Sequence, residues 1–92
     1  MPVLVKITNR GLPIEMYDHV AAALIPQLKR QAGFHAHVCY PTADGFTVNE
    51  LWDSAEQQTT WFERNVRPQL PPDAHPDIEV VELHSLATPQ SA

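Results

Sequence analysis

The chain has 92 residues, 43% hydrophobic and 18% charged, a composition typical of one small globular domain with a modest core. Its formal net charge is −5 with only 6 Lys and Arg, which argues against a nucleic-acid partner because that affinity depends on neutralising phosphates. A single cysteine, no apolar run of membrane-spanning length and no signal-peptide pattern lead us to expect a cytoplasmic protein with no membrane partner.

The first half of the chain predicts a strand followed by a helix. Residues 2–8 are β-branched and almost continuously apolar, as in a strand with neighbours on both sides. Asn9 and a turn at Gly11 follow, and residues 14–31 show the apolar spacing of an amphipathic helix. Pro26 lies inside this helix and predicts a kink or a break, since proline removes a backbone hydrogen bond.

A hairpin is predicted over residues 34–52, because apolar side chains there recur with period two. One face of its first strand carries Phe34, Ala36, Val38 and Tyr40. The opposite face carries His35, His37 and Cys39. Asp44 and Gly45 form the turn, where Gly45 would supply a positive φ. The second strand carries Phe46, Val48, Glu50 and Trp52 in phase.

The last third of the chain predicts a second helix and a final strand. Ser54 and Gln57 fit a capping box at the start of a helix that runs to Leu70. Its apolar side carries Gln58 (by its stem), Phe62, Val66 and Leu70, with Trp61 beside them. Residues 78–83 are predicted as a strand and residues 87–92 as a flexible C-terminal tail.

The predicted order β-α-β-β-α-β indicates an α+β, ferredoxin-like fold in one domain of residues 1–86. Its four-stranded antiparallel sheet would carry both helices on one face. The other face would then expose Leu4, Leu51 and either Val81 or Ile78, an apolar patch larger than monomers usually tolerate. We therefore expect a homodimer formed through the open sheet face.

A small-molecule pocket is expected between the helices and the sheet, where the layers separate. The candidate substrate-binding residues are Tyr17, Trp61, Phe34, Tyr40, Phe46, Trp52 and Phe62. They would line an aromatic slot for a small apolar or aromatic ligand. The alternative is that these large side chains simply fill the core.

Glu50 is the residue that packing explains least, because an acid lies in phase with apolar residues of a half-buried strand. Burial without a partner would suit it to proton abstraction, whereas a salt bridge to Lys6 or Arg10 is the structural alternative. His35 and His37 could share a metal ion, but the strand spacing keeps Cys39 from the same ion, so we predict no metal site.

The residues Glu50-Leu51-Trp52-Asp53-Ser54, followed by a helix with an aromatic pair at Trp61 and Phe62, resemble the antibiotic-biosynthesis-monooxygenase-like (ABM-like) domains. These domains belong to the dimeric α+β barrel superfamily, whose members pair their sheets face to face. The resemblance covers most of the chain. It implies a cofactor-independent monooxygenase that acts on an aromatic or polyketide-like molecule.

Under this resemblance Glu50 or His37 would accept a proton, and Tyr17, Asn9 and Trp61 would position the substrate. We count Asn9 with Glu50 and His37 as the candidate catalytic residues. Asn9 and Trp61 also match positions used by haem-degrading members of the superfamily, but the histidine expected near Pro71 is absent and His75 is the nearest.

A non-catalytic dimeric module that binds a small ligand or a partner is the second hypothesis. No nucleophile with an activating base is visible, and the three glycines mark turns, not a phosphate-binding loop. Convergence of Glu50 and Tyr17 on one cavity would favour the enzyme, and a filled core would favour the module.

Overall fold

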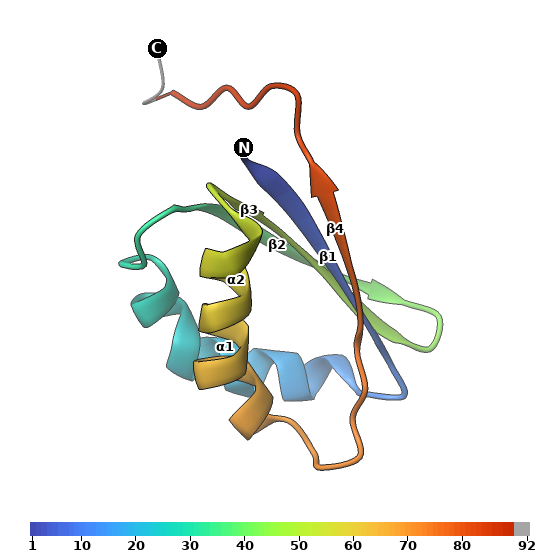
Figure 1. Ribbon diagram of the computed structural model, residues 1–92. Coiled ribbons are helices and arrows are strands. Elements are labelled where there is room, and N and C mark those ends of the chain that lie inside the picture. Colours follow the sequence, from blue (N-terminus) through green and yellow to red (C-terminus); the bar gives the residue numbers. More distant parts are fainter. Residues whose placement is uncertain (90–92) are drawn as a thin grey trace.

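The structure is a computed structural model that describes residues 1–89. Its elements are β1 (Val3–Arg10), α1 (Ile14–Leu28), β2 (Phe34–Thr42), β3 (Gly45–Trp52), α2 (Ala55–Trp61), η1 (Phe62–Val66), η2 (Arg67–Gln69) and β4 (Asp77–Glu82). The four strands form one antiparallel sheet in the order β2-β3-β1-β4. Figure 1 shows that both helices cover the same face of this sheet. The predicted α+β, ferredoxin-like fold is confirmed.

The core lies between the helices and the two central strands. On β1 every second residue is buried, from Val3 through Val5 to Ile7, and Asn9 continues this row at 5% exposure. The antiparallel register places Val5 opposite Glu50 on β3, so that strand also turns alternate residues toward the helices. The buried apolar residues are Val3, Val5, Ile7, Leu24, Leu28, Phe46, Val48, Trp52, Trp61 and Phe62.

Strand β2 departs from its predicted alternation at a β-bulge between Phe34 and Ala36. Beyond the bulge His37 pairs with Glu50, and directly paired residues of two strands share a face of the sheet. The bulge therefore turns His37 toward the helices. A shift of one residue reverses the facing of every later residue in the strand.

The predicted grouping of Ala36, Val38 and Tyr40 with the buried side of β3 is consequently wrong. Val38 pairs with Asn49 and Tyr40 with Thr47, on the face away from the helices. There Val38 is 56% and Tyr40 44% exposed. His35 is the residue that the register skips at the bulge, and its ring pairs with Asp53, whereas His37 lies opposite Glu50.

The helices differ from their predicted extents near prolines. α1 runs without a break through Pro26 and ends at Leu28, because Pro26 lies in the last turn, where only one backbone bond is lost. α2 is capped as predicted by the Ser54 hydroxyl, which accepts from the Gln57 backbone N–H at 3.2 Å. The Gln57 side chain accepts from that hydroxyl at 3.1 Å, in place of the Ser54 backbone N–H that a capping box uses. Its α-helical part ends at Trp61. The chain continues as a π-helix, η1, and a 3₁₀ turn, η2, that contains Pro68.

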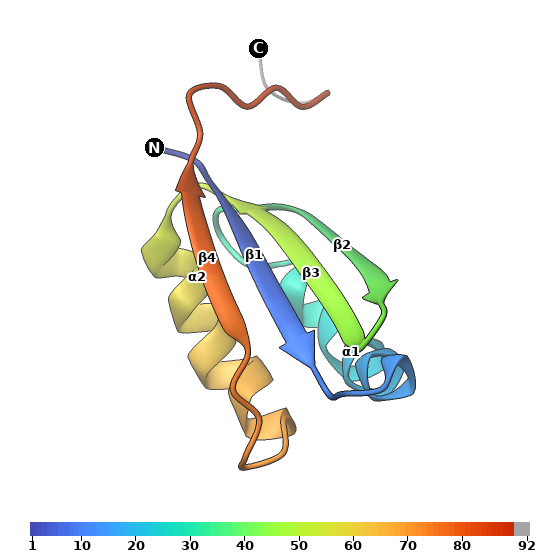
Figure 2. The same cartoon turned by 90° about the vertical axis from the view of Figure 1, so that its right-hand side faces the viewer.

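The open face of the sheet is only partly apolar, because Lys6 lies there between Asn49 and Glu79. Figure 2 views the molecule from that side. Leu4 pairs with Leu51 on one side and Val81 on the other, so all three share the open face, whereas Ile78 pairs with Ile7 and faces the helices. None of the helices in residues 1–89 is long and apolar enough to cross a membrane. Of the predicted tail, residues 87–89 belong to no helix or strand, and residues 90–92 lie outside the described residues.

Gly45 has a role other than the predicted one. Among residues 1–89 the positive φ angles belong to Gly11 and Gly33, so the hairpin turn does not use one at Gly45. A Cβ at Gly45 would instead overlap the backbone carbonyl oxygen of Asn9 on the neighbouring strand. The glycine is required because two backbones approach each other closely.

We expect Gly45→Ala to lower the free energy of unfolding by about 1–3 kcal/mol, the usual cost of forcing an extra group into filled space. Urea denaturation of the two proteins measures this difference. Gly11→Asn is the control, because nothing lies within 4 Å of a Cβ there and asparagine tolerates positive φ. Equal stability of Gly45→Ala and the wild type would show that the sheet relaxes around the added carbon.

Candidate active site

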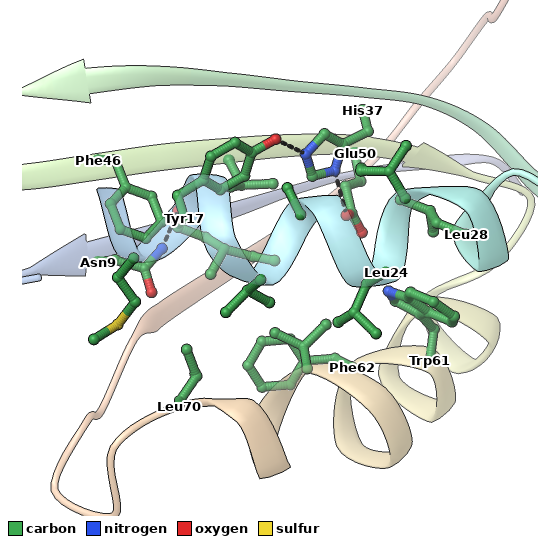
Figure 3. A pocket seen from close by; sticks show the side chains of 17 residues that line it. Asn9, Tyr17, Leu24, Leu28, His37, Phe46, Glu50, Trp61, Phe62 and Leu70 are labelled. Carbon is green, nitrogen blue, oxygen red and sulfur yellow. Dashed lines mark hydrogen bonds and ion pairs between the residues drawn. The ribbon is translucent and has the colours of Figure 1, made fainter. Parts of the chain in front are cut away.

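A cavity of about 70 Å³ lies between the sheet and the helices. Its wall is largely apolar, with side chains from the three strands β1, β2 and β3 and from α1, α2 and η1 (Figure 3). The polar side chains in this wall are Asn9, Tyr17, His37 and Glu50. A few polar groups that converge on an apolar cavity are typical of a small-molecule site.

Three of the polar side chains form a continuous chain of hydrogen bonds, which we call the Tyr17–His37–Glu50 chain (Figure 3). Tyr17 Oη lies 2.7 Å from His37 Nε2, and His37 Nδ1 lies 2.7 Å from Glu50 Oε2. Trp52 Nε1 donates to the second carboxylate oxygen, Glu50 Oε1, at 3.0 Å. Both oxygens of the buried carboxylate therefore have partners.

The direction of these hydrogen bonds follows from what each group can donate. An indole N–H only donates, and an ionised carboxylate only accepts, so Glu50 accepts from Trp52 and from His37 Nδ1–H. In a neutral imidazole Nε2 is then the acceptor, and it receives the Tyr17 hydroxyl proton. Tyr17 Oη keeps lone pairs that can accept a hydrogen bond from a ligand.

Local structure explains how these residues meet. The β-bulge places His37 directly opposite Glu50, and Trp52 follows Glu50 by two residues on the same face of β3. Tyr17 projects from the first turns of α1 and stacks on His37, with ring centroids 5.9 Å apart and planes 15° apart. Phe46 supports the other side of Tyr17 at 5.5 Å. Packing therefore holds the hydroxyl against the imidazole.

Burial raises the pKa of Tyr17 from 10.0 to about 12, and the nearby charges of Cys39, Asp18 and Glu50 add to the shift. Tyr17 is therefore a protonated hydrogen-bond donor at neutral pH. Burial also raises the pKa of the Cys39 thiol, with a further contribution from Asp18, so the reactive thiolate form of Cys39 is disfavoured.

The raised pKa of Tyr17 predicts a loss of stability at alkaline pH. Unfolded Tyr17 ionises near pH 10.0 and folded Tyr17 near pH 12, so its contribution is fully present below pH 10.0 and disappears as the pH rises to about 12. Urea denaturation across this range should show a shallower decline in Tyr17→Phe than in the wild type. Tyr40→Phe is the control, and parallel curves for all three proteins would contradict the assignment.

No known family profile matches the chain, and no curated protein sequence matches it. Among solved structures it is similar to SnoaB, a cofactor-independent oxygenase from Streptomyces nogalater, with a TM-score of 0.63 and 14% identity over 92% of this chain and 93% of that one. The chain has the fold of ABM-like domains.

Two further structures share this ABM-like fold. A conserved protein from Methanosarcina mazei Go1 has a TM-score of 0.66 and 13% identity, over 88% of this chain and 91% of that one. A protein of unknown function from Nitrosomonas europaea has a TM-score of 0.61 and 18% identity, over 98% and 94%. At such identities the ABM-like likeness establishes the fold, and the chemistry has to be argued from the residues of the site.

The ABM-like fold brings most of the sequence-predicted site residues to one cavity. The wall contains Asn9, Tyr17, His37, Phe46, Glu50, Trp61 and Phe62. Three predicted residues are not part of it. Phe34 packs edge-on against Trp52, with centroids 5.4 Å apart, and Tyr40 lies on the open face. Trp52 donates to Glu50 and lines a separate groove beside Trp61.

The structure gives Glu50 and His35 partners other than those considered from the sequence. Glu50 forms no salt bridge with Lys6 or Arg10, since its partners are His37 and Trp52, and Arg10 pairs with Asp77 at the sheet rim. His35 instead pairs with Asp53 at 2.6 Å on the surface. Residues 1–89 contain no group of three or more His, Cys, Asp or Glu that could hold a metal ion.

Sequence reasoning named Tyr17 of α1 as a site residue but not the other α1 residues that line the wall. The apolar residues of α1 in the wall are Met16, Val20, Ala21, Leu24, Ile25 and Leu28. Their helical spacing marks them as the buried side of the helix, which is the signal that could have placed them there. They enclose the cavity opposite the sheet.

The haem-degrading arrangement considered from the sequence does not match this site. Asn9 and Trp61 line the cavity, but His75 is exposed and is not part of the wall. Among the described residues that line the cavity, the histidine is His37, and both of its ring nitrogens already have hydrogen-bond partners in Tyr17 and Glu50.

Proposed function

We propose that this protein is a cofactor-independent monooxygenase that takes a proton from a hydroxylated aromatic or polyketide-like molecule bound in the cavity. The observation that carries the proposal is the Tyr17–His37–Glu50 chain, with two hydrogen bonds of 2.7 Å beside a largely apolar cavity. The likeness of its fold to that of the oxygenase SnoaB supports the same class of reaction.

The proton moves along the chain in one direction. The ligand hydroxyl donates to Tyr17 Oη, the Tyr17 proton passes to His37 Nε2, and Tyr17 remains a phenol. The ligand O–H bond breaks and one N–H bond forms on His37. The resulting imidazolium is stabilised by the buried Glu50 carboxylate, which the Trp52 indole holds in place.

The ligand then supplies the electrons for oxygen. In an anthrone, ionisation of the enol hydroxyl places negative charge on the ring carbon, and this electron-rich carbon reacts with O₂ without a cofactor. One oxygen atom replaces the two hydrogens of a CH₂ group as C=O, and the other leaves with them as water. The apolar wall keeps bulk water from the ligand anion.

The non-catalytic binding module is the weaker alternative. A module predicts a filled core, whereas Tyr17 and Glu50 both reach the wall of one cavity. Burying connected polar side chains costs folding free energy unless each of them has a hydrogen-bond partner. Every member of the Tyr17–His37–Glu50 chain has one. Convergence of the polar groups therefore favours the enzyme.

We also propose that the protein forms a homodimer through the open sheet face. Leu4, Leu51 and Val81 lie side by side there, and the bulge on β2 adds Val38 and Tyr40 to the same surface. Two-fold pairing of this face with a second copy would remove an exposed apolar patch from water.

Incubation with a panel of anthrones and hydroquinones, with and without air, tests the proposed reaction. We expect oxygen uptake with at least one compound and a product that has gained one oxygen atom, with no product under argon. If calorimetry shows tight binding of a panel member and the oxygen electrode shows no uptake, the binding module becomes the better description.

A further inference from the structure

The cavity is too small for the ligand that the proposed function requires. Its volume is about 70 Å³. An engineered core cavity that binds benzene has a volume of roughly 150 Å³, about twice as large. A ligand with even one aromatic ring can therefore enter only if a side chain of the wall moves.

A second hollow lies on the outside of the same wall. It is a groove of about 460 Å³ between the end of α1 and the α2–η1 helix, with a polar rim that includes Gln57, Thr60, Arg64 and Asn65. Trp61 is the residue that lines both this groove and the inner cavity. Its side chain, 3% exposed, is the partition between the two hollows.

The two tryptophans of the protein are held differently. The Trp52 indole is fixed by its hydrogen bond to Glu50 at 3.0 Å. Within residues 1–89 no group accepts a hydrogen bond from the Trp61 indole, so no polar contact fixes its ring. A ligand that reaches the partition can also accept a hydrogen bond from this free N–H.

The backbone at Trp61 is irregular as well. The α-helix ends there and the π-helix η1 begins at Phe62, and π-helical turns are rare and concentrate at functional sites. The Trp61 carbonyl accepts from the Asn65 side chain at 3.2 Å, and Asn65 lies in the groove. Trp61 therefore lies where the helix changes from α-helical to π-helical geometry.

We propose that the cavity and the groove are two halves of one substrate site, divided by Trp61. When the Trp61 indole swings aside, the ring that reacts enters the cavity, and a polar substituent stays in the groove against Gln57 and Thr60. The ligand class is a fused-ring hydroxylated molecule with a polar substituent at its far end. The identity of the reacting ring rests on the proposed function, but the two-part site does not depend on oxygen chemistry.

Binding kinetics without oxygen test this division. We expect Trp61→Phe to raise the association rate constant of 1-naphthol by about tenfold in stopped-flow measurements, whereas the loss of an ordinary wall contact changes mainly the dissociation rate. Thr59→Val is the matched control, because Thr59 is exposed on the same helix and lines neither hollow. An unchanged association rate in Trp61→Phe, or no binding of 1-naphthol to the wild type, would overturn the proposal.

Two further measurements do not depend on how well Trp61→Phe folds. In the wild type, saturation with 1-naphthol should shift the Trp61 indole N–H signal in NMR more than that of Trp52. Thr60→Val should weaken binding of 1,5-dihydroxynaphthalene and leave that of 1-naphthol unchanged. An unmoved Trp61 signal, or equal effects on both ligands, would contradict the two-part site. Binding as expected without oxygen uptake in air would overturn the proposed function alone.

Discussion

Glu50→Gln is expected to lower the rate of oxygenation by about 10²- to 10⁴-fold, the range that a positioned acid–base group contributes. The glutamine can keep the hydrogen bond from Trp52 through its oxygen, and its amide then points at His37. Since an amide donates, His37 has to accept at Nδ1 and carry its proton on Nε2. Tyr17 can then no longer pass its proton to His37.

Oxygen uptake under saturating substrate measures this effect. Tyr17→Phe removes the first member of the chain and should cause a loss of the same order, with the circular dichroism spectrum unchanged in both variants. Glu63→Gln is the matched control, because it makes the same chemical change at an exposed carboxylate that pairs with Arg67 outside the site. Full activity of Glu50→Gln would remove the carboxylate from the mechanism.

Val38→Asp is expected to convert the proposed homodimer into monomers. Val38 is 56% exposed in the single chain, more than any other large apolar residue of the strands, and the change puts a charge there. Burying an unpaired charge costs several kcal/mol, so two copies in one interface should raise the dissociation constant by at least about 10³-fold.

Light scattering coupled to gel filtration reports the mass of each variant. The control Thr59→Asp introduces the same charge on the helical side, at an exposed residue away from the open face, and should remain dimeric. A wild-type protein that is a stable monomer at high dilution would contradict the proposed face-to-face dimer, independently of the result for Val38→Asp.

The fold could be predicted from the sequence because its elements have strong local signals. The apolar row of β1, the helical spacing of α1 and the Ser54 cap of α2 each mark an element that the structure contains. Boundaries were less well predicted. The spacing of Phe62 and Val66 suits an α-helix, yet the chain takes a π-helical turn there, since apolar spacing alone does not distinguish the two.

Only part of the candidate site could be predicted from the sequence. Glu50 stands out in the sequence as an acid in an apolar row, but its partner depends on the register of a neighbouring strand. The bulge between Phe34 and Ala36 turns His37 inward and leaves Tyr40 outside. No local pattern marks this inserted residue, because it follows from how β2 pairs with β3 across the whole hairpin.

The role of Gly45 could not be predicted from the sequence either, because it depends on a contact with a distant segment. The dipeptide Asp44-Gly45 correctly indicates a turn, but the reason for the glycine is a backbone from another part of the chain, the Asn9 carbonyl. Contacts between distant segments decide both this residue and the partner of Glu50. They become visible only once the sheet is assembled.

The protonation of the His37 ring tests the central claim most directly. NMR of the protein with ¹⁵N-labelled histidine, assigned with His37→Gln, distinguishes a proton on Nδ1 from one on Nε2. The Tyr17–His37–Glu50 chain requires the resting ring to carry its proton on Nδ1, toward Glu50, and to leave Nε2 as the acceptor for Tyr17. A neutral ring with its proton on Nε2 would contradict this account.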